Sequence, residues 1–262
     1  MSQYAHPVVY TLFIWWFSTG VILYLDGLPR WTFKWTMLGA TAFLLLALLG
    51  LHVTGQDTRV TGAYLAFTCA ILVWAWQEVA FLLGYVTGSR REPCPPQAQG
   101  WLRLRYALQA VSHHEIALVV LGLLVTAATW NAPNDTGFWT YMVLWIMRQS
   151  AKLNVFLGVR NLNESFLPAH LKYMQTYFNR RAMNPLFPFS VLIGSVVAWL
   201  VWQGAVGDGA DAFQVASLTF VATLLSLAVL EHWFLVLPLP SEALWSWGLR
   251  SRTAGAAVDK LL

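Results

Sequence analysis

Ionisable side chains stand inside long apolar stretches of this chain, where they are costly and usually face a bundle interior or a cavity. Imidazole and carboxylate together suit iron, zinc or manganese, and an imidazole alone can be an axial ligand of haem or of chlorophyll-type magnesium. The candidates for such chemistry are Glu78, His113, His114, Glu115, Glu231 and His232.

Two basic residues, Arg148 and Lys152, lie about one helical turn apart in a further apolar stretch and supply counter-charges. Two interpretations stay open. In the first, these cations neutralise two of the three carboxylates in a structural ion-pair network, because buried charges must be paired. In the second, the cluster binds a transition metal or a tetrapyrrole, or handles protons. The metal ligands would then come from Glu78, His114, Glu115, Glu231 and His232.

The spacing of these residues differs from that of established metal motifs. Helix-built di-iron sites use Glu-x-x-His pairs, and none occurs here. The pair His114-Glu115 begins like a zinc-protease helix, but Leu118 stands where the second His is required. No P-loop, Gly-x-Ser-x-Gly or dinucleotide-binding fingerprint is present. The sequence leaves the enzyme question open and favours a protein that is not an enzyme. Secondary candidates outside the cluster are Asn154, Glu164 and His170.

Transmembrane helices must position the cluster. The chain has 262 residues, of which 58% are hydrophobic and 11% charged, whereas a soluble domain carries roughly a quarter charged residues. A bilayer core of ~30 Å requires about 20 mostly apolar residues per helix. We therefore predict one all-α transmembrane domain over residues 1–262 with about seven helices. The predicted spans are 8–25, 35–54, 61–86, 106–129, 138–158, 187–204 and 213–236.

Lys and Arg residues sort into alternate connections. The first, third and fifth connections and the C-terminal tail hold two, four, four and three of them, or 13 in all, and Lys260 is the last. The remaining connections and the N-terminal tail hold only Arg59. The positive-inside rule then predicts an outer N-terminus and a cytoplasmic C-terminus. The connections carry neither a long basic run nor an RNA-reading motif, so nucleic-acid binding is not indicated.

This topology predicts that the charged residues of four helices lie in one layer, ~8–15 Å from the cytoplasmic ends of those helices. We expect Glu78, Glu115 and Glu231 to point into the bundle, each near Arg148, Lys152 or a His. In the fifth connection, apolar residues at helical spacing predict an amphipathic helix over 166–180. It would lie on the cytoplasmic membrane surface or pack on the bundle.

Short stretches from helix 61–86 to helix 213–236 form a specific combination. They are 76–78 (Trp-Gln-Glu), 81–84, 87–88, 94–95, 114–115, 154–161, 167–171, 184–188 and 231–238. Together they resemble the photosynthetic complex assembly protein family PuhE of phototrophic purple bacteria. The resemblance implies a multi-pass protein of the bacterial cytoplasmic (inner or intracytoplasmic) membrane.

The resemblance further implies a factor that supports assembly of the reaction centre and light-harvesting complexes, or their bacteriochlorophyll supply. Its partners would be reaction-centre or light-harvesting subunits or bacteriochlorophyll-synthesis enzymes, beside the lipid bilayer. The family brings no established catalytic residues to these positions. The alternative is a membrane metalloenzyme of tetrapyrrole or isoprenoid metabolism that uses the Glu/His cluster. A proton-coupled carrier ranks below both.

Overall fold

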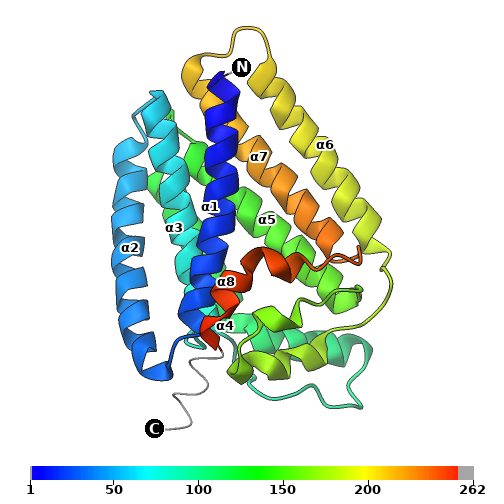
Figure 1. The fold of residues 1–262 in the computed structure, drawn as a ribbon. Helices are drawn as coiled ribbons and strands as arrows, with labels where there is room; N and C mark the ends of the chain where they lie inside the picture. Colours follow the sequence, from blue (N-terminus) through cyan, green and yellow to red (C-terminus); the bar gives the residue numbers. More distant parts are fainter. Residues whose placement is uncertain (1, 253–262) are drawn as a thin grey trace.

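The computed structural model describes residues 2–252, and seven long helices form its bundle (Figure 1). The described range contains no β-strand, so the all-α prediction is confirmed. Lys260 lies outside the described residues. The long helices are α1 (Ser2–Asp26), α2 (Phe33–Thr54), α3 (Val60–Leu82), α4 (Gly100–Ala128), α5 (Thr136–Leu157), α6 (Leu186–Val206) and α7 (Ala212–Phe234).

Six of the described helices are long and apolar enough to cross a membrane, and α5 is the long helix that is not among them. Its second half carries four strongly polar residues, namely Arg148, Gln149, Lys152 and Asn154. The helix nevertheless lies at the centre of the bundle, between α3 and α7 (Figure 1). Its polarity follows from this position, because neighbouring helices rather than lipid supply the partners of its side chains.

The connections sort to the two ends of the bundle. The N-terminus and the connections α2–α3, α4–α5 and α6–α7 lie at one end, and the other connections and the C-terminal segment lie at the opposite end (Figure 1). The end with the C-terminal segment is the end that carries the basic connections. The connections rich in Lys and Arg therefore lie at one end of the bundle, and the connections poor in them lie at the other. The orientation of these ends toward the cytoplasm stays a prediction.

Two helix boundaries differ from the expected ones at glycines with positive φ. Helix α3 ends at Leu82 rather than near residue 86, because Gly84 turns the chain with φ +83°, a conformation that favours glycine at a helix C-terminus. Helix α4 begins at Gly100, φ +52°, before the predicted start at 106. Its first turns carry Arg103 and Arg105 and extend the helix beyond the predicted span.

The fifth connection forms 3-10 helical turns in the region where the sequence predicts an amphipathic helix over 166–180. These turns are η2 (Glu164–Phe166) and η3 (Ala169–Tyr177). Leu171, Met174 and Tyr177 are buried at every third position, which matches the about three residues per turn of a 3-10 helix. The first two pack on the end of α3 in one apolar cluster. The segment therefore packs on the bundle.

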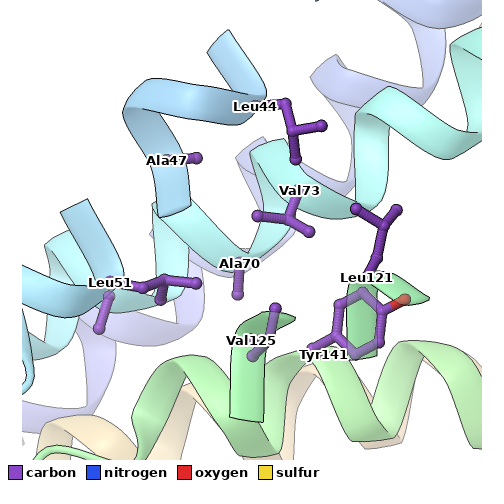
Figure 2. Packing of buried hydrophobic residues seen from close by; sticks show 9 residues of the cluster. Leu44, Ala47, Leu51, Ala70, Val73, Leu121, Val125 and Tyr141 are labelled. Carbon is purple, nitrogen blue, oxygen red and sulfur yellow. The ribbon is translucent and has the colours of Figure 1, made fainter. Parts of the chain in front are cut away.

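An apolar core joins α2, α3, α4 and α5 in the half of the bundle that faces away from the C-terminal segment. Figure 2 shows Leu44 and Leu51 of α2 beside Val73 of α3 and Val125 of α4. Tyr141 of α5 is fully buried there, and its hydroxyl donates to the Leu118 carbonyl at 2.7 Å. This core fixes the depth at which α5 presents its later, polar residues.

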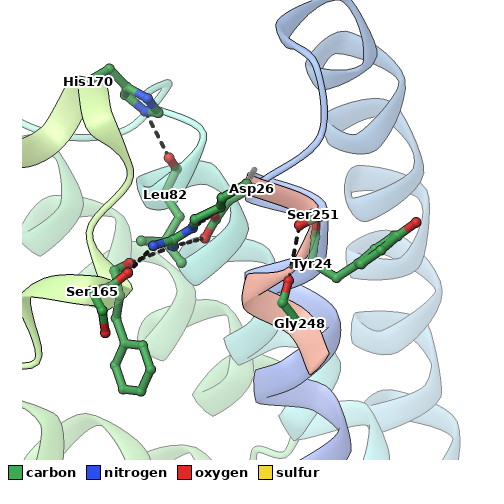
Figure 3. A network of polar contacts seen from close by, with 9 residues as sticks. Tyr24, Asp26, Leu82, Ser165, His170, Gly248 and Ser251 are labelled. Atoms are coloured by element: carbon green, nitrogen blue, oxygen red, sulfur yellow. Dashed lines mark hydrogen bonds and ion pairs between the residues drawn. The ribbon is translucent and has the colours of Figure 1, made fainter. Parts of the chain in front are cut away.

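The C-terminal segment holds the lower half of α1 against the rest of the bundle. It comprises η4 (Ser241–Trp245) and α8 (Ser246–Leu249), and the Trp247 ring occupies the space that a Cβ at Gly20 would need. Arg252 bonds both carboxylate oxygens of Asp26 at 2.9 Å. It also donates to the carbonyls of Ser165 and Phe166 in the fifth connection, and Figure 3 shows Asp26 and Ser165 on either side of this contact.

Candidate functional site

Glu78 of α3 and Arg148 of α5 form the first ion pair of the cluster. The guanidinium Nη2 of Arg148 donates to Oε2 of Glu78 at 3.2 Å, and the Gln77 amide donates to Oε1 at 3.1 Å. The carboxylate is buried, but the Arg148 side chain is 45% exposed. Because this bond uses one of several N–H donors of the guanidinium, Arg148 keeps others for a further partner.

Glu115 of α4 and Lys152 of α5 form the second ion pair. The ammonium of Lys152 donates to Oε1 of Glu115 at 2.7 Å, and the Gln149 amide donates to Oε2 at 2.6 Å. Gln149 and Lys152 are three residues apart and so share one face of α5. The two counter-charges of α5 therefore serve different neighbours, one on α3 and one on α4.

Glu231 of α7 takes a different partner from the other two carboxylates. Its Oε1 accepts from the indole Nε1 of Trp15 on α1 at 2.7 Å. Arg148 attracts it electrostatically without a direct bond in the described structure. The residue keeps accessible surface, although groups of α1, α3 and α5 surround its carboxylate. Glu231 therefore lies near Arg148, as expected, and bonds Trp15 in place of a direct ion pair.

His232 follows Glu231 in sequence and faces a different way, about 100° around the helix. It is 1% exposed; Nδ1 lies 2.8 Å from the Ala228 carbonyl, and Nε2 lies 2.9 Å from the Ser150 hydroxyl. A carbonyl can only accept, so Nδ1 donates to Ala228, and Nε2 can then accept from Ser150. Both ring nitrogens are thus engaged, which leaves none for a metal.

The adjacent histidines of α4 also separate. His114 is 1% exposed, its ring centroid lies 4.5 Å from that of Phe81, and its Nδ1 has no hydrogen-bond partner among the described residues. Arg148 and Lys152 act on it electrostatically. The ring is therefore enclosed by neighbouring side chains. His113 is exposed on the outside of the bundle.

Asn154, the first secondary candidate, joins α5 to α6. Its buried amide nitrogen donates to the Ser190 hydroxyl at 3.0 Å and to the Ser150 carbonyl at 2.9 Å. The Asn184 amide in turn donates to Oδ1 of Asn154 at 3.1 Å. These bonds satisfy buried polar groups, which indicates a structural role.

The other secondary candidates lie in the fifth connection. The Nε2 of His170 lies 2.9 Å from the Leu82 carbonyl and donates to it at the end of α3 (Figure 3). Burial lowers the pKa of His170 below its ordinary value of 6.5. Glu164 is paired with Arg180 at 2.6 Å on the surface. Neither residue joins the intramembrane cluster.

The donor set does not fit a metal ion. Within the described residues, no three His, Cys, Asp or Glu side chains lie close enough together to hold one. Glu78 and Glu115 are bound to separate cations, and His232 is bound through both nitrogens. The cluster is therefore a set of paired charges rather than a converging ligand set.

Several members of this network were not predicted from the sequence. They are Trp15, Gln77, Gln149 and Ser150. Gln77 and Gln149 did carry a signal, because amides inside apolar helices are costly and adjoin charged candidates. Trp15 and Ser150 are common in membrane helices and carried none.

The chain is similar to one curated protein along most of its length. It is 37% identical over 245 residues, 92% of this chain and 89% of that protein, to the "Uncharacterized 30.4 kDa protein in puhA 5'region" of Rhodobacter capsulatus. No solved structure matches the chain. The family model described as "Protein of unknown function (DUF3623)" matches residues 1–256, and the chain belongs to this family.

Proposed function

We propose that the chain is a multi-pass protein of the bacterial cytoplasmic membrane that supports assembly of photosynthetic complexes or their bacteriochlorophyll supply. The observation that carries this proposal is the similarity, over nearly the whole chain, to a Rhodobacter capsulatus protein named for its place in the puhA 5' region. The resemblance to PuhE proteins in residues 76–238 supports the same pathway. The partners would be reaction-centre or light-harvesting subunits or enzymes of bacteriochlorophyll synthesis.

The geometry favours a binding role over a metalloenzyme. The charged side chains of α5 pair with carboxylates on α3 and α4. Helices α2 and α6 lie at opposite edges of the bundle (Figure 1) and keep most of their apolar surface outward. Such faces suit contact with lipid or with the membrane helices of a partner.

An in-frame deletion of the related gene in Rhodobacter capsulatus, complemented with this chain, tests the proposal. Because that gene lies 5' of puhA, a strain that receives puhA alone controls for altered expression of the neighbour. We expect reduced near-infrared absorbance of pigment-protein complexes in the deletion strain, restored by this chain but not by puhA alone. Full absorbance in the deletion strain would contradict the proposal.

A second readout separates assembly from pigment supply. Affinity purification of the tagged chain from gently solubilised membranes should retain reaction-centre or light-harvesting subunits if the chain acts in assembly. Retention of pigment-synthesis enzymes instead would assign it to bacteriochlorophyll supply.

A further inference from the structure

A polar hollow of about 430 Å³ lies between α4 and the connection that precedes it. The connection contributes Ser89, Arg90, Arg91 and Glu92 to its lining, and α4 contributes Gln109. The α3–α4 connection belongs to the end of the bundle that carries the basic connections (Figure 1). The volume lies within the range of ligand clefts, about 300–1,000 Å³, and the charged lining favours a polar ligand group over an apolar one.

The connection approaches α4 so closely that main-chain groups bond each other. The Arg90 amide donates to the Gln109 carbonyl at 3.3 Å, and the His114 amide donates to the Thr87 carbonyl at 2.9 Å. A Cβ at Gly88 would clash with the Gln109 carbonyl oxygen, so this approach requires glycine. The two sides of the hollow are therefore held together by the backbone.

Arg90 forms a fixed part of the lining. Its Nε donates to the Tyr177 hydroxyl at 2.8 Å, and its guanidinium lies 4.2 Å from the centroid of the Tyr106 ring. Its Nη1 pairs with Oε1 of Glu92 at 3.0 Å, and the Arg90 side chain is 17% exposed. The pair neutralises Glu92, so the negative charge in the lining is already balanced.

Other donors beside the hollow are uncommitted. Arg91 and Arg105 are exposed, and neither makes a hydrogen bond or an ion pair within residues 2–252. The side-chain amide of Gln109 also has no hydrogen-bond partner in that range. Arg105 lies one helical turn before Gln109 and so shares its face of α4. The hollow is thus flanked by two positive charges without a counter-ion and by a free amide.

These donors suit a phosphate better than a carboxylate. Guanidinium groups bind both anions through paired N–H donors. The free donors here come from two elements, Arg91 on the connection and Gln109 on α4. A tetrahedral phosphate presents oxygens in several directions and can accept from both sides, whereas the two oxygens of a carboxylate lie in one plane.

The hollow also lies near the level of the membrane surface. The apolar stretch of α4 begins directly after Arg105. Trp101, one turn before Arg105, is 76% exposed, and Leu108, next to Gln109, is 53% exposed. Aromatic side chains favour the head-group level and exposed leucines favour the hydrocarbon. The head groups of lipids are therefore within reach of the hollow.

We propose that this hollow binds the phosphate group of a phosphate ester. Arg91 and the Gln109 amide donate to the phosphate oxygens, and Arg105 adds electrostatic attraction. An anionic phospholipid and a soluble phosphate ester share this chemistry, and the level of the hollow favours the lipid. The proposal does not rest on the photosynthetic assignment.

Native mass spectrometry of the full chain in micelles of a neutral detergent tests this site. Phosphatidylglycerol, phosphatidylcholine and diacylglycerol with the same acyl chains are added in equal amounts, and the adducts of the chain are quantified. We expect phosphatidylglycerol to be retained most, because diacylglycerol lacks the phosphate and the choline of phosphatidylcholine cancels its charge. Excess glycerol 3-phosphate identifies the source: a lipid adduct should survive it, whereas a site for soluble esters should exchange the lipid for it.

The matched variants are Arg91→Gln and, as a control, Arg160→Gln, which removes the same charge from an exposed position in the fifth connection, away from the lining. Loss of one charge-assisted hydrogen bond predicts about tenfold weaker retention in Arg91→Gln. Retention by Arg160→Gln should equal that of the wild type. Arg105→Gln is the second variant and should weaken retention in the same direction.

Retention that is unchanged in both Arg91→Gln and Arg105→Gln would overturn the site. A loss of equal size in Arg160→Gln would also overturn it, because the attraction would then come from the overall charge of this end. Equal retention of phosphatidylglycerol and diacylglycerol, with no adduct of glycerol 3-phosphate, would overturn the phosphate assignment and favour an acidic protein segment as the occupant.

Discussion

Replacing Lys152 with Met should destabilise the protein by about 2 kcal/mol. The change keeps a long side chain but removes the cation that lies 2.7 Å from Glu115, whose carboxylate then retains the Gln149 amide. Losing a partner costs about 3–5 kcal/mol in a fully buried pair and about 0.2–1 kcal/mol in an exposed one. The side chains of this pair are 27% and 29% exposed, which places the cost between these limits.

The assay is reversible unfolding in mixed micelles, followed by circular dichroism, in a double-mutant cycle with Glu115→Met. The double variant has no orphaned charge, so it should recover most of the stability lost in the Lys152→Met variant. Lys172→Met is the control, because this exposed lysine lies in the fifth connection outside the cluster; its effect should stay within about 0.5 kcal/mol.

Two results would refute this reasoning. A Lys152→Met protein within about 0.5 kcal/mol of the wild type would mean that the pair adds little. A double variant as unstable as the sum of the single variants would mean that the two residues are not coupled.

Further predictions concern the C-terminal segment and the fifth connection. Gly20→Val should push the Trp247 ring off α1 and make the C-terminal segment sensitive to limited proteolysis. Arg252→Gln should have a similar, weaker effect in the same assay, because it removes the paired contacts to Asp26. Burial lowers the pKa of His170 below 6.5, so below that pH the unfolded chain binds a proton that the folded chain does not. Stability should therefore fall as the pH drops through 6.5, and less steeply in His170→Gln when unfolding is followed against pH.

The transmembrane helices could be predicted because their signal is strong and local. Apolar stretches of bilayer length and the alternation of basic connections together specified seven helices and their directions along the bundle. The fifth connection could not be predicted in the same way. Its buried residues Leu171, Met174 and Tyr177 recur every third position, and a short apolar pattern does not distinguish a 3-10 helix from an α-helix.

The depth of the charged cluster in the bundle could be predicted from the sequence, but the direction in which each side chain points could not. The predicted topology places the charged residues of several helices at one depth. The pairs that Glu78 and Glu115 form with the cations of α5 follow from this placement. The rotation of each helix does not follow, because adjacent residues differ by about 100° and sequence alone does not say which of them faces inward. His232 is buried while Glu231 is exposed, and His114 is buried while His113 faces outward. Packing of whole helices decides between them.

Glu115 and Lys152 form an ion pair at 2.7 Å, and we propose that this pair is structural in a chain that supports assembly of photosynthetic complexes. A charge swap tests it most directly: Glu115→Lys, Lys152→Glu and the double swap are introduced into the complementation strain, and near-infrared absorbance is measured at equal protein levels by immunoblot. The account predicts that each single swap lowers absorbance and that the double swap restores it toward the wild type. A double-swap protein that accumulates normally and yet leaves absorbance at the deletion level would contradict a structural role for the pair.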